Sequence, residues 1–369
     1  MRGGTSKGAV FRASDLPLNE RTRDRVLTAV MGGLGELQID GIGGGHPLSN
    51  KVAIVALSSE AGVDIDYLFL QVSPVTGSVD TTQNCGNMLA ATGPFAITEG
   101  LIAVEDSQTR VRVRMLNSGN LCELTVQTPG GCVEYEGDTA IDGVPGTSAP
   151  IICDYLDVAG SACGSMLPTG RAMDSIDGVD VTLIDNGMPV VLVRAGDLGV
   201  TGVELPAELE SNLKLVAAKE SIRLQAGMMM GLGDVSAKTV PKVSLLSSPV
   251  GEGVIATRTF IPHSVHMSIG VLGAASIATA CLLPGAVAEG LIQGTLPGAD
   301  GSYDLGIEHP SGALQINIRA RSTSAGLRVE RVGVVRTARL LFRGEVCVPT
   351  AVWTGHQKKG QDIRDAANA

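Results

Sequence analysis

Two residues in this chain have the side chains and the setting for proton-transfer chemistry. Cys85 follows Asn84, a good helix N-cap, and precedes Gly86 and an apolar run that ends near residue 97. The free amides and positive dipole end of a helix attract anions and favour a thiolate. A cysteine there can also be a small packing residue, and position alone leaves both interpretations open.

The second residue is Lys51, which stands where a glycine-rich loop at 40–50 meets an apolar strand predicted for 52–57. Burial at the edge of such a strand favours the neutral, basic form of the amine. A solvent-facing lysine at a strand end is the alternative, and it would be preferred if Lys51 stood alone.

The composition bounds the class of protein. The chain has 369 residues, 44% hydrophobic and 18% charged, with 48 glycines and 3% aromatics, which is enough for two domains of short strands and small-residue helices. A net charge of −10 argues against a nucleic-acid partner. Seven cysteines without a C-x-x-C pair indicate a reducing cytoplasm. We expect no signal peptide and no membrane-spanning segment.

The elements that must position the two residues follow from periodicity. We predict an amphipathic helix at 20–31, a strand at 66–72 that leads to the Cys85 helix, and a hairpin formed by 110–116 and 121–127. Residues 205–230 are predicted to be helical. Residues 332–342 read as a strand that returns to the first domain.

A second polar stretch, with Ser268 and Gly270, opens another apolar helix at 268–283. The repetition predicts a pseudo-duplicated protein, in which 1–168 with 334–369 form one domain and 169–333 the other. If the two helix N-termini face each other, they form a clamp for a di- or tricarboxylate. The polar residues after 353 are expected to be frayed.

Other polar groups are weaker candidates. Ser6 and Lys7 lie in a glycine-rich opening that lacks the P-loop order, so it is either an anion-binding loop or a solvated turn. Asn186 breaks two apolar strand pieces as a substrate contact or a turn residue. His263 and His266 have no nearby acid or cysteine, which favours hydrogen bonding over metal binding.

Several motifs occur in an order that resembles the 2-methylaconitate isomerase and 4-oxalomesaconate tautomerase family over nearly the whole chain. They are Met-Arg-Gly-Gly-Thr-Ser-Lys-Gly at 1–8, Gln-Ile-Asp-Gly-Ile-Gly-Gly at 38–44, Lys-Val-Ala-Ile at 51–54, Gln-Asn-Cys-Gly-Asn at 83–87, Gly-Pro-Phe-Ala-Ile at 93–97, Asp-Asn-Gly-Met-Pro at 185–189 and Ser-Ile-Gly-Val-Leu-Gly-Ala at 268–274. Residues 167–170, 197–202 and 262–270 look most like the 4-oxalomesaconate branch, which serves bacterial gallate and protocatechuate 4,5-cleavage breakdown.

The resemblance implies an α+β, diaminopimelate epimerase-like fold, with two barrel-and-helix domains and the active site in the cleft between them. It also implies an allylic proton shift on a small tricarboxylate keto acid without a cofactor. The start of the second helix has no thiol, which argues against two-thiol epimerisation. We expect a homodimer. The predicted catalytic residues are Lys51 and Cys85, and the predicted substrate-binding residues are Ser6, Lys7, Asn84, Gly86, Asn87, Asn186, Arg258, His263, Ser268 and Gly270.

The chain departs from the family pattern in two ways. The short strand that usually precedes the first motif is missing, which implies a late start codon or a first sheet without that edge. Ser49-Asn50 replaces the more usual Thr-Ser before Lys51. Three alternatives stay open: a 2-methylaconitate cis–trans isomerase, a two-base amino-acid racemase or epimerase, and a non-catalytic carboxylate-binding accessory protein.

Overall fold

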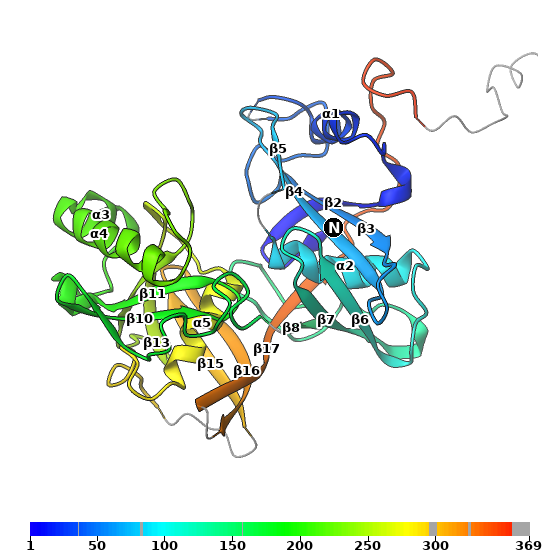
Figure 1. The fold of residues 1–369 in the computed structure, drawn as a ribbon. Helices are drawn as coiled ribbons and strands as arrows, with labels where there is room; N and C mark the ends of the chain where they lie inside the picture. The colour runs from blue at the N-terminus through cyan, green and yellow to red at the C-terminus, as the bar shows by residue number, and fades with distance from the viewer. Residues whose placement is uncertain (36, 82–83, 157, 295–300, 324–325, 356–369) are drawn as a thin grey trace, which may run out of the picture.

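Two curved sheets, each wrapped on one apolar helix, make up the protein (Figure 1). The structure is a computed structural model that describes residues 1–35, 37–81, 84–156, 158–294, 301–323 and 326–355. The frayed end predicted after residue 353 therefore lies largely outside the described residues. No helix in these ranges is long and apolar enough to cross a membrane.

The first half of the chain carries eight strands and two helices. They are β1 (Arg2–Gly3), β2 (Ser6–Arg12), α1 (Glu20–Met31), β3 (Lys51–Leu57), β4 (Ile65–Val72), β5 (Val79–Asp80), α2 (Gly86–Thr98), β6 (Ser107–Met115), β7 (Leu121–Thr128) and β8 (Pro150–Leu156). The predicted helix at 20–31 and the predicted hairpin are confirmed, because β6 and β7 pair antiparallel.

The second half carries nine strands and three helices. They are β9 (Asp174–Ile176), β10 (Val179–Asp185), β11 (Pro189–Arg194), α3 (Pro206–Ser211), α4 (Leu213–Met229), β12 (Lys242–Ser247), β13 (Ile255–Ile261), β14 (Ser264–Val265), α5 (Val271–Cys281), β15 (Ser302–His309), β16 (Gly312–Thr323) and β17 (Gly326–Arg339).

The prediction that 205–230 is helical is confirmed, but the segment is divided into two helices. Asn212 leaves the helical conformation, with φ −78° and ψ 90°, and separates α3 from α4. Its side-chain oxygen accepts a hydrogen bond from the Leu215 amide, so the residue caps a new helix.

The strand pairing of the first half is repeated in the second half. β2 and β3 pair in parallel, β3 and β4 antiparallel, and β4 continues in parallel to β6. β11, β12, β13 and β15 repeat the same three pairings in the same order. The internal duplication therefore makes β12 the counterpart of β3 and β13 the counterpart of β4.

The apolar helices lie inside these sheets, as their lack of a polar face predicts. α2 contacts β1–β4, β7, β8 and β17, while α5 contacts β10, β11, β15, β16 and β17. Both helices contribute to one continuous hydrophobic core. α1 and α4 pack on the outer faces of the two sheets over separate apolar clusters.

β17 joins the halves. It pairs antiparallel with β16 through Val334 and with β8 from Val332 to Thr337, and its end pairs with β1. The predicted return of this strand to the first domain is confirmed. The predicted domain boundary at 333/334 falls where β17 has partners in both halves.

Candidate active site

The start of α2 is built around Cys85. Cys85 is itself the N-cap, with extended backbone angles and a carbonyl that accepts from the Leu89 amide. The prediction that Asn84 caps the helix was wrong by one residue. Asn84 lies just outside, and its buried Oδ1 has no hydrogen-bond partner among the described residues. Because no side chain among the described residues caps α2, its first amides are available to an anion.

Two buried tyrosines surround this helix start. Tyr67 Oη donates a hydrogen bond of 3.1 Å to the Cys85 carbonyl. A Cβ placed on Gly86 would lie 2.6 Å from Tyr155 Oη, so glycine lets that hydroxyl reach the first turn. Burial raises the pKa of both tyrosines well above 10, which keeps the two hydroxyls neutral as hydrogen-bond donors.

Lys51 begins β3 and points to the same side of the sheet as α2. The alternation along the strand settles this, since Ala53 belongs to the core around α2 and Val52 to the cluster under α1. Lys51 Nζ donates a 2.8 Å hydrogen bond to Gln71 Oε1 and lies 5.0 Å from the centre of the Phe69 ring.

Strand β4 connects the lysine to the cysteine. Tyr67, which bonds the Cys85 carbonyl, and Phe69, whose ring lies beside Lys51 Nζ, are consecutive inward side chains of this strand. The two predicted catalytic residues are therefore held by one rigid element.

The β1–β2 turn lies against the first turn of α2. A Cβ on Gly3 would stand 2.3 Å from the Asn87 carbonyl oxygen, which explains the glycine pair of the first motif. Asn87 Nδ2 donates to Thr5 Oγ1 at 2.9 Å and fixes the turn.

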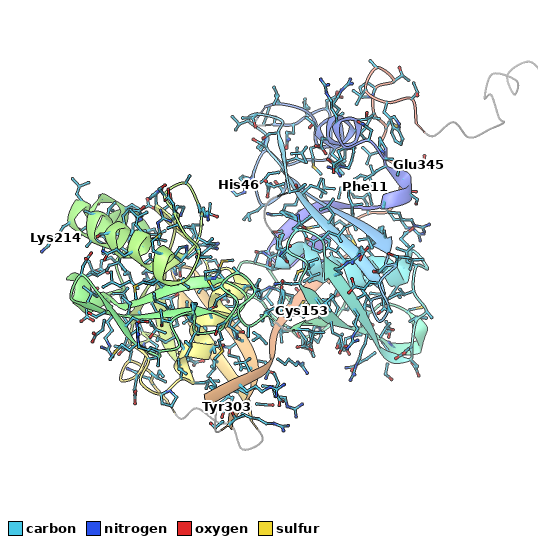
Figure 2. The ribbon with its side chains drawn as sticks, in the orientation of Figure 1. Phe11, His46, Cys153, Lys214, Tyr303 and Glu345 are labelled. Carbon is cyan, nitrogen blue, oxygen red and sulfur yellow. The ribbon has the colours of Figure 1, made fainter. Side chains whose placement is uncertain are left out.

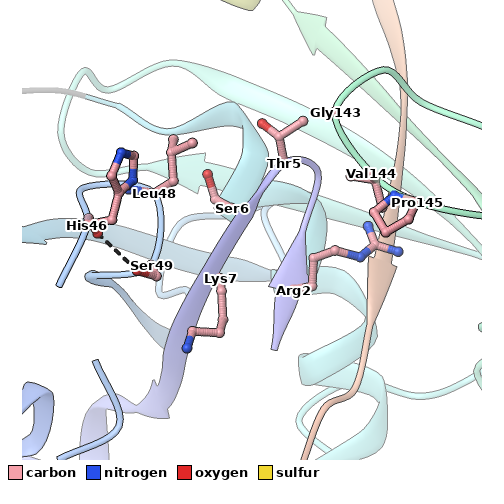
Figure 3. A pocket seen from close by; sticks show the side chains of 10 residues that line it. All are labelled: Arg2, Thr5, Ser6, Lys7, His46, Leu48, Ser49, Gly143, Val144 and Pro145. Atoms are coloured by element: carbon pink, nitrogen blue, oxygen red, sulfur yellow. Dashed lines mark hydrogen bonds between the residues drawn. The ribbon is translucent and has the colours of Figure 1, made fainter. Parts of the chain in front are cut away.

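A cavity of about 300 Å³ opens beside this turn (Figure 3). Ser6 and Lys7 line it, and the buried Ser6 Oγ has no hydrogen-bond partner among the described residues. Lys51 and Cys85 do not line it. The other lining residues are Arg2, Thr5, His46, Leu48, Ser49, Gly143, Val144 and Pro145.

The start of α5 matches the start of α2 in position but not in chemistry. Gly270 is the N-cap of α5 and takes the place that Cys85 has in α2, without a side-chain cap. Ser268 Oγ lies 3.3 Å from His309 Nε2, and the Ser268 amide donates to His266 Nδ1 at 2.9 Å. The structural counterpart of Cys85 is therefore a glycine, which agrees with the lack of a second thiol noted in the sequence.

The starts of α2 and α5 meet. A Cβ on Gly86, the first residue of α2, would lie 3.4 Å from Val271 Cγ2 in the first residue of α5. The two helix starts are therefore close together, as the clamp requires. Two sets of free amides converge on one region, which suits a substrate with several carboxylates.

Residues 1–349 match the PrpF protein family. The chain belongs to the PrpF family. It is 52% identical to the 4-oxalomesaconate tautomerase of Pseudomonas putida, over 97% of each chain. It is 50% identical to the (4E)-oxalomesaconate Delta-isomerase of Novosphingobium sp., over 94% of this chain and 96% of the relative. The crystal structure of a methylitaconate-delta-isomerase superposes with a TM-score of 0.83 at 31% identity, over 95% of both chains.

Three residues predicted to bind substrate in this PrpF-family chain have structural partners elsewhere. Asn186 is fully buried, and its Nδ2 donates to Thr279 in the body of α5 at 2.7 Å. Arg258 donates to the carbonyls of residues 203 and 204. His263 is 65% exposed on the β13–β14 turn, 3.9 Å from Glu220.

Sequence reasoning also missed residues of the site. Tyr67 and Tyr155 carry no motif signal, because only the curvature of the sheet brings them to α2. Lys242 lies by the start of α5 for the same reason, and Arg336 lies on β17, which packs against both α2 and α5. Lys242 did have a signal, since it begins an apolar strand as Lys51 does.

Proposed function

We propose that this protein is an isomerase that moves a proton along the allylic system of 4-oxalomesaconate. Two relatives that are at least 50% identical along almost their whole length carry names for reactions of this acid, which supports the proposal. The structural observation that carries it is the joint attachment of Lys51 and Cys85 to β4 beside two converging helix N-termini.

In the proposed reaction, Lys51 as a neutral amine takes a proton from the carbon next to the keto group or its vinylogue. The C–H bond breaks, an N–H bond forms, and the electron pair spreads into a dienolate. Gln71 Oε1 and the Phe69 ring contact the resulting ammonium and stabilise it.

The free amides after Cys85 and Gly270 hold the carboxylates and the enolate oxygen, which is where negative charge develops. Lys51 or Cys85 then returns a proton at the far end of the system. The step balances without a cofactor, because one proton leaves and one returns with no net transfer of electrons.

The proposal extends to the setting of the enzyme. The fold is of the diaminopimelate epimerase-like type, and the substrate belongs to bacterial breakdown of gallate or protocatechuate by 4,5-cleavage. All seven cysteines are free in the structure, which supports work in a reducing compartment. A homodimer remains the expected assembly.

Separate incubations with 4-oxalomesaconate and 2-methylaconitate test the substrate, with proton NMR of the products. We expect a double-bond shift only in 4-oxalomesaconate. Conversion of 2-methylaconitate alone would favour the cis–trans isomerase, and thermal stabilisation by 4-oxalomesaconate without turnover would favour the accessory protein. Deuterium exchange at an amino-acid α-carbon would favour a racemase.

A Cys85→Ser variant tests the role of the thiol. If Cys85 carries the returning proton, the pH–rate profile changes together with the turnover number. An unchanged profile would restrict Cys85 to the wall of the site.

A further inference from the structure

Lys242 repeats the position of Lys51 in the second half of the protein. Lys51 begins β3 and faces Gly8 of the parallel strand β2, and Lys242 begins β12 and faces Val190 of the parallel strand β11. Leu246, four residues after Lys242, belongs to the core around α5, whereas Val243 packs under α4. The alternation therefore turns Lys242 toward α5, as Lys51 is turned toward α2.

The position of its ammonium group agrees with this register. Lys242 Nζ lies 3.9 Å from the place where a Cβ on Gly270 would stand, so the amine lies beside the uncapped start of α5. Burial lowers the pKa of Lys242. The pKa of His266 is lowered first by burial and also by the positive charge of Lys242, which places the two side chains in one region.

Lys242 differs from Lys51 in having no partner. Gln71 holds Lys51, and the matching place on β13 is taken by Ile261, which follows Phe260 as Gln71 follows Leu70. Lys242 forms no hydrogen bond or ion pair with any residue that the structure describes. The side-chain amide of Gln71 orients Lys51, whereas the N–H donors of Lys242 remain available to a ligand.

Arg336 is a second cation in the same region. It lies on the inward face of β17 between the core residues Val334 and Ala338, and it is 9% exposed. Its Nη1 donates to the carbonyl of Val335, but its Nε is buried without a hydrogen-bond partner, and it forms no ion pair within the described part of the chain. Burial lowers its pKa, and electrostatic interactions with Cys153, Tyr155 and Cys85 raise it.

A buried guanidinium without a carboxylate is costly, because its desolvation is not offset by an ion pair. Arginine nevertheless stays charged at neutral pH. An anionic ligand would supply the missing counter-charge, and the strand that carries Arg336, β17, packs against both α2 and α5.

We propose that Lys242 and Arg336 bind carboxylates of the substrate beside the junction of α2 and α5. This inference rests on the proposed function for the identity of the ligand, a tricarboxylate. The two duplicated lysines then have different roles: Lys51 transfers the proton and Lys242 binds a carboxylate.

Propane-1,2,3-tricarboxylate is a suitable probe, because it has three carboxylates but no double bond to isomerise. Isothermal titration with the full chain compares wild type with Lys242→Met, Lys242→Arg and Arg336→Met, with Lys214→Met as the exposed-lysine control. We expect the Kd to rise about tenfold to a hundredfold in Lys242→Met and Arg336→Met, since each loses a charged hydrogen bond. Lys242→Arg should retain most of the affinity.

Kinetics with 4-oxalomesaconate separate binding from chemistry. We expect Lys242→Met to raise KM while kcat stays close to that of wild type. If Arg336→Met does not fold, as judged by circular dichroism, Lys242→Met decides the question. Unchanged probe affinity in Lys242→Met, loss of its kcat at constant KM, or a wild type that does not bind the probe would each overturn the inference.

The proposed function can fail independently. A wild type that does not convert 4-oxalomesaconate, but binds the probe in a way that depends on Lys242 and Arg336, would leave the carboxylate site standing and remove the isomerase.

Discussion

Gln71 accepts a 2.8 Å hydrogen bond from Lys51 Nζ, and its own amide donates to the carbonyls of Pro47 and Asn50. Gln71 therefore connects the Lys51 amino group to the loop before β3 by hydrogen bonds. In the second half, Ile261 takes the place of Gln71, and no described residue forms such a hydrogen bond with Lys242. This difference is the basis for proposing different roles for the two lysines.

Replacing Gln71 tests this anchor. Gln71→Met removes the hydrogen bond that fixes Lys51, so we expect kcat to fall about tenfold to a hundredfold with a much smaller change in KM. Steady-state kinetics measure the effect, and Gln108→Met on the exposed edge of β6 is the control. Unchanged kcat in Gln71→Met would mean that Lys51 needs no orientation by this side chain.

Gly86 is predicted to tolerate no side chain. In Gly86→Ala the new Cβ would stand 2.6 Å from Tyr155 Oη and 3.4 Å from Val271 Cγ2, at the point where the helices meet. We expect the free energy of unfolding to fall by about 1–3 kcal/mol and substrate affinity to fall with it, measured by urea denaturation and by KM.

The matched control is Gly273→Ala in α5, where a Cβ would meet nothing within 4 Å. Alanine there favours the helix, so its unfolding free energy should stay unchanged or rise by up to about 1 kcal/mol. Equal losses in the two variants would contradict the close contact of the helix starts.

The histidines near the start of α5 should make stability depend on pH. Burial lowers the pKa of His266 and His309 below 6.5. As the pH falls, the unfolded chain therefore binds protons before the folded protein does. The stability that these histidines contribute is fully present above pH 6.5 and is lost as the pH falls through their folded pKa values.

Each ring also accepts a backbone amide at Nδ1, from Ser268 in one case and Ser311 in the other, and protonation breaks these bonds. Thermal unfolding between about pH 7.5 and 5 should show a smaller decline in His309→Gln than in wild type or in the exposed-site variant His263→Gln. A midpoint that rises on acidification would contradict the assignment.

Asn186 shows where sequence reasoning reached its limit. Its motif suggested a substrate contact, but the side chain bonds Thr279 and the main-chain amide bonds Ser276, both in α5. We expect Asn186→Ala to lower the free energy of unfolding by about 1–3 kcal/mol, with turnover per folded molecule close to that of wild type. Loss of turnover at unchanged stability would return Asn186 to the site.

The sequence pattern predicted the features that depend on neighbouring residues, such as where helices begin. An apolar run after a polar cap placed the Cys85 helix to within one residue, and the repeated pattern before Gly270 predicted the duplication. Whether a polar side chain faces substrate or another strand depends on register, which the sequence does not contain. Arg258 in β13 and His263 on the β13–β14 turn therefore have partners away from the helix starts.

The dependence on register also explains why the sequence did not single out Lys242 and Arg336. Lys242 is the one charged residue of the apolar strand β12, and only the pairing of β12 with β11 brings it beside the start of α5. Arg336 is one of several charged residues of β17, and only the pairing of that strand shows that it faces inward. Applied a second time, the rule that selected Lys51 would have selected Lys242.

The most direct test of the account follows 4-oxalomesaconate by proton NMR in D₂O with wild type, Lys51→Met and the control Lys214→Met, whose lysine lies on α4 away from the helix starts (Figure 2). We expect wild type and Lys214→Met to shift the double bond and incorporate deuterium at one carbon. Lys51→Met should bind the acid but lose turnover by about 10²–10⁴-fold, the usual contribution of a general base. Near-normal turnover in Lys51→Met would contradict the role of Lys51 as the base.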